Sequence, residues 1–177
     1  MTIAGGNGPP SPPRLAVPIR ISARADYATR ACAELAADPA GRMSGDQIAA
    51  AQNIPLKFLL NILTELSRGN IVHSHRGTSG GYQLTRPASQ ITIAEILHAA
   101  EGPAARIRGF SPQELHYTGA AEHLREVWVA VQATLENLLQ AVTLADLVAG
   151  TLPPTVATLT RTPPPRPASP RPAGERA

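Results

Sequence analysis

Two short helical segments, joined by a tight turn and followed directly by a glycine-rich hairpin, constrain the fold of this chain more than any other feature. Ser44 and Gln47 form a capping box that begins a helix expected over Gly45–Ala51. After the turn, Pro55 suits the first position of a second helix, which ends before Gly69. Two short helices connected in this way are typical of a helix-turn-helix.

The second helix of this pair has an apolar face and a polar face. Apolar residues at helical spacing form the face expected in the core, namely Leu59, Ile62, Leu63 and Leu66. The opposite face carries Lys57, Asn61, Thr64 and Arg68. We therefore expect this segment to be the recognition helix, with Lys57, Asn61 and Thr64 in contact with DNA.

A hairpin follows the second helix. Ile71–Arg76 and Tyr82–Thr85 have the pattern of short strands, and a glycine-rich segment separates them. A hairpin directly after a recognition helix makes a winged helix, whose wing lies along a phosphate backbone or enters a minor groove. A nucleotide-binding phosphate loop is a competing interpretation, but such loops join a strand to a helix and usually carry a lysine. The wing residues expected to contact DNA are Arg76, Thr78, Ser79 and Gly80.

Three further segments complete the expected helices. Ser22–Ala37 carries apolar residues at the spacing of one buried stripe. A capping box formed by Thr92 and Glu95 begins a second segment, and one formed by Thr143 and Asp146 begins a short last helix. These helices would surround the helix-turn-helix and its wing.

The longest predicted helix covers about Ala120–Ala141. Its large apolar residues are spaced alternately by four and three positions, which is a heptad seam. A long helix that projects from a small winged helix usually packs against a second copy, so we expect a homodimer. The residues expected in the dimer interface are Leu124, Trp128, Val131, Leu135 and Leu138.

Proline marks the ends of the folded part. Most of the 18 prolines lie in residues 1–18 and 151–177, which we expect to be disordered tails. Between them we expect a winged helix-turn-helix domain over residues 19–102, a linker over 103–118, and a dimerisation helix with a short final helix over 119–150. The predicted fold class is mainly α, a winged helix-turn-helix with a two-stranded wing plus a long C-terminal dimerisation helix.

Charge is distributed unevenly along the chain. Residues 19–86 carry eight Lys or Arg and five Asp or Glu, whereas residues 87–150 carry three and seven. This asymmetry fits a nucleic-acid-binding end and a non-binding end, although solvated surface charge is an equally simple explanation. No stretch approaches the roughly 20 apolar residues that span a bilayer, and no secretory signal is evident, so we expect a cytoplasmic protein without a membrane partner.

Taken in order, these residues resemble the Rrf-type winged-helix transcription regulators, the family of IscR, NsrR and CymR. The resemblance covers about Ile19–Gly150, and its markers are Ile21–Ala28, Arg76–Leu84 and Val142–Leu147, of which the wing segment is the most specific. It implies a homodimer joined by the long helix, with two winged helices on double-stranded DNA at a palindromic promoter site. We therefore expect a repressor of transcription, with an unknown small-molecule effector as a further partner.

The chain departs from this family where other members hold an iron-sulfur cluster. Cluster-binding members have three cysteines in the linker and often a histidine near the start of the long helix, but residues 103–118 contain no cysteine and Arg125 stands at the histidine's position. A guanidinium cannot ligate iron, so we expect neither a metal nor another cofactor. Leu60 stands where the family commonly has a glutamate in the recognition helix, so the operator should differ from that of such relatives.

No other residues indicate chemistry. Cys32 lies on the apolar stripe of the first helix, which favours a core residue over a redox sensor. His73 and His75 alternate on a wing strand, where phosphate contact or simple exposure is more usual than metal binding. No nucleophile, acid and base gather as an enzyme requires, so we expect no catalysis. The alternative function is a protein-interaction adaptor that keeps the winged helix without specific DNA binding.

Overall fold

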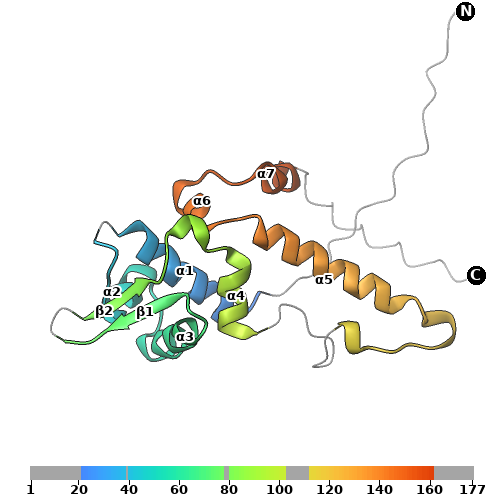
Figure 1. The fold of residues 1–177 in the computed structure, drawn as a ribbon, viewed down its shortest axis with the longest axis horizontal. Helices are drawn as coiled ribbons and strands as arrows, with labels where there is room; N and C mark the ends of the chain where they lie inside the picture. The colour runs from blue at the N-terminus through green and yellow to red at the C-terminus, as the bar shows by residue number, and fades with distance from the viewer. Residues whose placement is uncertain (1–20, 39, 78–79, 103–111, 162–177) are drawn as a thin grey trace, which may run out of the picture.

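The computed structural model describes residues 21–38, 40–77, 80–102 and 112–161, and this part of the chain is mainly helical (Figure 1). The α-helices are α1 (Ala23–Ala37), α2 (Gly45–Gln52), α3 (Leu56–Arg68), α4 (Ile93–Glu101), α5 (Leu124–Gln140), α6 (Leu144–Ala149) and α7 (Pro154–Arg161). Short 3-10 turns are η1 (Ala88–Gln90), η2 (Pro112–Glu114) and η3 (Gly119–Ala121). Strands β1 (Val72–His75) and β2 (Gly81–Leu84) pair antiparallel. The predicted fold class, a mainly helical winged helix-turn-helix with a two-stranded wing and a long following helix, is confirmed.

Side-chain caps explain where several helices begin. The three predicted capping boxes are confirmed, and their pairs are Ser44 with Gln47, Thr92 with Glu95, and Thr143 with Asp146. In each box the first side chain accepts a hydrogen bond from the backbone of the second residue, and the second side chain accepts one from the backbone of the first. Hydrogen bonds from the Thr143 hydroxyl and backbone hold the pKa of Asp146 below its usual value.

Backbone hydrogen bonds join the start of α4 to the start of α6. Thr92 and Thr143 form an antiparallel β-bridge between the two caps. The Ile93 N–H donates to the Val142 carbonyl at 3.0 Å, and the Leu144 N–H donates to the Ile91 carbonyl at 2.8 Å. The C-terminal end of α5 is thereby fixed beside the start of α4.

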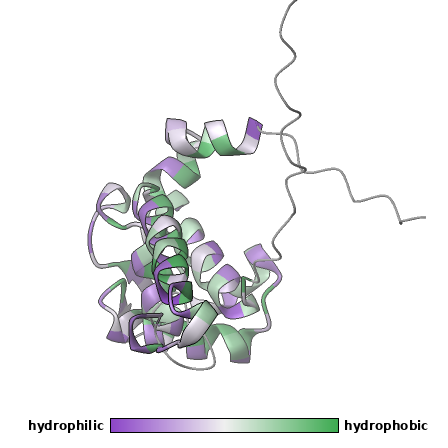
Figure 2. Cartoon of the chain, turned by 90° about the vertical axis from the view of Figure 1, so that its right-hand side faces the viewer, coloured by the Kyte–Doolittle hydropathy of each residue, from purple (hydrophilic) through white to green (hydrophobic). Residues whose placement is uncertain are grey.

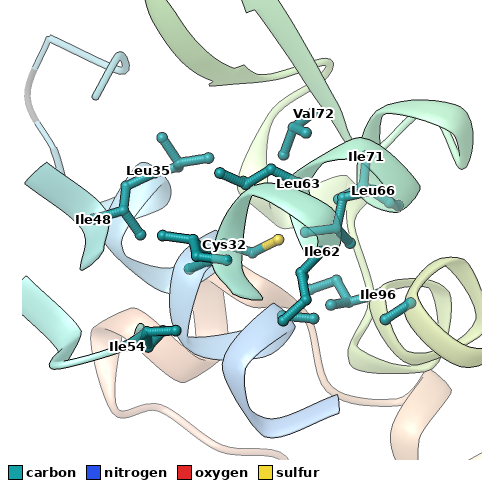
Figure 3. Close-up of a cluster of buried hydrophobic side chains, with 14 of the residues drawn as sticks. Cys32, Leu35, Ile48, Ile54, Ile62, Leu63, Leu66, Ile71, Val72 and Ile96 are labelled. Carbon is teal, nitrogen blue, oxygen red and sulfur yellow. The ribbon is translucent and has the colours of Figure 1, made fainter. Parts of the chain in front are cut away.

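The core lies between α1, α2, α3 and α4, closed by β1 and by the start of α6. Its largest fully buried side chains include Leu35, Ile48, Leu59, Ile62, Leu63, Leu66, Ile71, Ile91, Ile96 and Leu144. Cys32 lies among them, completely buried (Figure 3). Burial raises the pKa of the Cys32 thiol to about 12, because a thiolate would lose its hydration there. We call α1–α4, the hairpin and α6 the body.

The structure differs from our expectations outside the body. The long helix begins at Leu124 rather than near Ala120, since η3, with Gly119 at a φ of 63°, precedes it. Disorder throughout residues 151–177 was a wrong prediction, because Pro154–Arg161 forms α7. Proline is well placed in the first turn of a helix, and the next seven residues contain no proline or glycine. The tail 1–18 and most of the linker lie outside the described residues.

The chain beyond the body has few close neighbours. The C-terminal end of α5 lies beside α4, while its N-terminal end projects far from the hairpin (Figure 1). Helix α7 lies apart from the body in both views and contains no buried residue (Figure 2).

Candidate nucleic-acid interface

Helix α3 presents Lys57, Asn61 and Thr64 together on one exposed face. The residues on the opposite face are Leu59, Ile62, Leu63 and Leu66, and all four are fully buried. The predicted polarity of this helix is therefore confirmed, and the three candidate DNA-contacting side chains share one face.

Two side chains of α3 are engaged within the helix itself. The Thr64 hydroxyl donates to the Leu60 carbonyl at 2.9 Å. Arg68 donates to Glu65 at 2.8 Å, which partly compensates its charge. Lys57 makes no ion pair with any residue that the structure describes. Its ammonium group is the cation of this face that remains available to a phosphate.

The predicted turn between α2 and α3 is present at Asn53, whose φ of 50° is left-handed. Asparagine tolerates this conformation better than other residues with a side chain, apart from aspartate. At the other end of α2, a Cβ on Gly45 would lie 3.0 Å from Leu60 Cδ2 and 3.6 Å from Leu56 Cδ1. The start of α2 thus packs closely against the first two turns of α3.

The hairpin is hydrogen-bonded to the segment before α2. The Met43 N–H donates to the Tyr82 carbonyl at 3.1 Å, and the Tyr82 N–H donates to the Met43 carbonyl at 2.7 Å. A Cβ on Gly81 would lie 2.7 Å from the Met43 carbonyl oxygen, a distance that no side chain tolerates. Gly81 is therefore required by this close contact within the fold.

Arg76 follows β1 directly and is exposed. We expected it to end the first strand, but the regular pairing stops at His75 opposite Gly81. Arg76 makes no ion pair with a described residue. Gly80, a predicted contact residue, is half-buried. A Cβ there would lie 2.6 Å from the His75 carbonyl oxygen, so the fold itself requires a residue without a side chain at this position. Thr78 and Ser79 lie outside the described residues.

Other kinds of site find little support in the described residues. No three His, Cys, Asp or Glu side chains come together there as a metal site would require. The His73 and His75 rings touch edge to face with their centroids 4.8 Å apart. The raised pKa of Cys32 keeps it protonated at neutral pH, whereas a reactive thiol needs the opposite shift. None of the described helices has the length and apolar character needed to cross a membrane.

The predicted dimer residues line one side of α5. Leu124, Trp128, Leu135 and Leu138 are half-buried, and Val131 is 43% exposed. Helix α5 packs on α4 and η2, and Gln132 is the one buried residue of the helix. The seam is therefore only partly covered by the chain itself.

Sequence reasoning missed several exposed apolar residues near these surfaces. Leu56 is 37% exposed and Leu60 40% exposed on α3, and Val127 is 52% exposed on α5. The signal for Val127 was its position one turn from Val131, next to the heptad seam. Leu60 was noticed only as a departure from a family pattern.

A cleft of about 590 Å³ lies between the body and α5. Its lining includes Arg86, Glu95 and His98 on the body and Glu136 and Leu139 on α5. Arg86 donates to Glu95 at 2.5 Å, so the cleft wall contains an ion pair. The cleft thus touches both the body and α5.

Comparisons with known proteins agree on the kind of molecule. The family model of Rrf2, described as an iron-dependent transcriptional regulator, matches residues 21–150. Rv1287 of Mycobacterium tuberculosis, named as an HTH-type transcriptional regulator, is 44% identical over 142 residues, covering 80% of this chain and 88% of that protein.

Two solved structures have the same fold over most of the chain. CymR, the global cysteine regulator of B. subtilis, has a TM-score of 0.63 and 28% identity, covering 75% of this chain and 98% of that one. The IscR of T. potens has a TM-score of 0.61 and 26% identity, covering 75% and 88%. The matched 21–150 segment includes the helix-turn-helix, the wing and α5.

Proposed function

Since this chain belongs to the Rrf2 family of transcriptional regulators, we propose that it is a dimeric, sequence-specific DNA-binding repressor that acts in the cytoplasm without an iron-sulfur cluster. Family and relatives are regulators of transcription and not enzymes. The observation that carries the finer proposal is the pair of exposed cations, Lys57 on α3 and Arg76 at the wing, on the two elements that winged helices use on DNA.

The test of DNA contact compares Arg76→Ala with Lys57→Ala on one operator selected from a random duplex library. An arginine in a narrow minor groove contributes both charge and hydrogen bonds, so its loss should weaken binding about 5- to 150-fold, most strongly with A·T-rich flanks. Lys57→Ala should weaken all sequences alike and reduce the salt slope by about one.

Both variants should keep the helical spectrum of the parent, because both side chains are exposed. Parent-like operator binding by a folded Arg76→Ala variant would show that the wing is not a DNA contact. The protein-interaction adaptor, which keeps a winged helix without specific DNA binding, would then be the better explanation.

The dimer is supported by the uncovered apolar side of α5. Val127 and Val131, 52% and 43% exposed, would form an apolar ridge in water if nothing covered them. We expect light scattering to give a dimer mass for the parent and a monomer mass for Leu135→Asp. A parent mass that stays monomeric at every concentration would contradict this part of the proposal.

We propose that no iron-sulfur cluster is bound, because the chain lacks the cysteine ligands for one. The chain has one cysteine, and Cys32 is sealed in the core, so thiolate ligands for iron are lacking. Protein purified without oxygen should be colourless and hold no stoichiometric iron. Iron at one or more equivalents, with visible charge-transfer absorption, would overturn it.

A small-molecule effector, if one acts on this repressor, is assigned to the cleft between the body and α5. Ligand there touches α4 on one side and Glu136 and Leu139 on the other, so it is placed to change how α5 meets the body. An effector found by operator release should lose its effect in an Ala94→Trp variant, whose indole fills the cleft. If the effector releases the operator from this variant as well as from the parent, the effector binds outside the cleft.

A further inference from the structure

The outward face of α3 is bordered by exposed apolar side chains. Leu60 is 40% exposed and Leu56 37% exposed, although each is close to the start of α2 at Gly45. The same place is approached by Tyr82 Cε2, 3.8 Å from the Cβ position of Gly45. These leucines therefore lie at the junction of α3 with α2 and the wing, beside the polar face and not beneath it.

Thr64, one turn after Leu60, contributes a further apolar group. Its hydroxyl hydrogen is used in the bond to the Leu60 carbonyl, so the side chain has no free donor to offer a base. Its methyl group remains on a residue that is exposed. Leu60 and Thr64 thus form a small apolar patch along α3, next to Asn61.

Asn61 makes no hydrogen bond through its side chain to a described residue, and its carboxamide is exposed. A carboxamide pairs in two places with the N6 and N7 atoms of adenine in the major groove. The thymine opposite that adenine presents its 5-methyl group in the same groove, and apolar side chains contact this methyl. An A·T pair thus offers one partner for Asn61 and another for the patch.

We propose that Leu60 and Thr64 contact thymine 5-methyl groups in the major groove and, with Asn61, make α3 specific for A·T pairs. This inference rests on the proposed DNA-binding function and deepens it. Charge favours DNA over a protein as the occupant of the patch, because Lys57 lies one turn before Asn61 on the same exposed face and carries no ion pair among the described residues.

The test removes single methyl groups from the DNA. An operator is selected from a random duplex library, and deoxyuridine replaces thymidine at one position at a time, which keeps base pairing and deletes the 5-methyl. Burial of one methyl corresponds to about fourfold in affinity, so the parent should lose about three- to fivefold at each contacted thymine. Substitutions outside the half-sites should have no effect and serve as the DNA control.

Matched variants assign the effect to the protein side chains. Thr64→Ser removes the methyl and keeps the hydroxyl bond within the helix, so it should bind thymidine and deoxyuridine equally at its position. Thr64→Val keeps a methyl and loses the hydroxyl, so it should keep the parental preference. Leu60→Ala should abolish the preference at the neighbouring position, while Lys57→Ala should weaken binding without changing any of these ratios.

The outcomes separate this inference from the function on which it rests. Tight operator binding by the parent with equal affinity for every deoxyuridine duplex would overturn the methyl contacts and leave DNA binding intact. Selected operators that lack A·T pairs at the positions protected by α3 would also overturn the methyl contacts while leaving DNA binding intact. Failure to select any operator would overturn the proposed function itself, and a protein partner displaced by Leu60→Asp would then identify the occupant of the patch.

Discussion

The body and α5 contain the same kinds of apolar residues at the same helical spacing, yet only the body covers them. Leu59, Ile62 and Leu63 on α3 are fully buried, whereas Val127 and Val131 on α5 are about half exposed. Helix α3 packs against α1, α2, α4 and β1, while the main contacts of α5 are with α4 and η2. A periodic apolar stripe therefore predicts that a face will be covered, but not whether the same chain covers it.

The largest expected difference between the two regions concerns large-to-small substitutions. Leu63→Ala should lower the free energy of unfolding by about 2–5 kcal/mol, because it leaves a cavity in a closed core. Val131→Ala should change it by at most about 0.5 kcal/mol, because that side chain is already hydrated. Urea denaturation in a Leu135→Asp background, in which the proposed dimer should not form, measures both. Equal losses would remove the contrast between the regions.

A smaller effect of opposite sign is expected at Gln132 on α5. This side chain is buried, and its Oε1 has no partner among the described residues, although its Nε2 donates to Glu136 at 2.7 Å. Gln132→Leu removes an uncompensated polar atom and should raise the free energy of unfolding by about 1 kcal/mol. Thermal unfolding of the two proteins at one concentration measures it, with the exposed Asn137→Leu as control. A loss of stability would show that the oxygen has a partner beyond the described residues.

Stability should also depend on Thr143, which caps α6 where α5 meets the body. Thr143→Ala deletes the side chain that caps α6 and lies in the bridge to Thr92, at a cost of about 1 kcal/mol. Thr143→Ser keeps the hydroxyl and should recover most of the loss. Unfolding followed by circular dichroism gives both values, and equal losses for alanine and serine would mean that the cap is not the cause.

Because Cys32 is buried in the body, we also expect the free energy of unfolding to depend on this residue's titration in the alkaline range and not near neutral pH. Burial raises the pKa of Cys32 from 9.0 to about 12, so the folded state keeps a proton that the unfolded state releases in this range. The contribution of Cys32 to stability is complete below pH 9 and is lost as the pH rises toward 12. Cys32→Ala should show a flatter alkaline limb in a series of urea denaturations. Identical limbs for the two proteins would contradict the assignment.

Local signals made most of the body predictable from the sequence. The capping boxes at Ser44, Thr92 and Thr143 depend on residues three positions apart, so the sequence alone contains both partners. The wing was predictable because two strand-like segments flank a glycine-rich turn. The polar face of α3 followed from its periodicity.

What sequence reasoning missed depends on contacts between distant segments. The need for glycine at position 81 comes from the close approach of the Met43 carbonyl, which lies in the segment before α2. Gln132 is buried although it is polar, and it lies on a helix that packs on the distant segments α4 and η2. Helix α7 was missed because the many prolines of residues 151–177 dominated the composition of the segment.

The two hydrogen bonds between Met43 and Tyr82 have a consequence for the thermodynamics of recognition. They hold the wing against the segment that begins α2, and α2 in turn packs on α3. The helix and the wing therefore lose their freedom to move relative to each other when the chain folds, and not when it meets a ligand. A DNA duplex that touches both α3 and the wing therefore binds a preorganised surface. The entropy cost of positioning the wing relative to α3 does not reduce the affinity for that duplex.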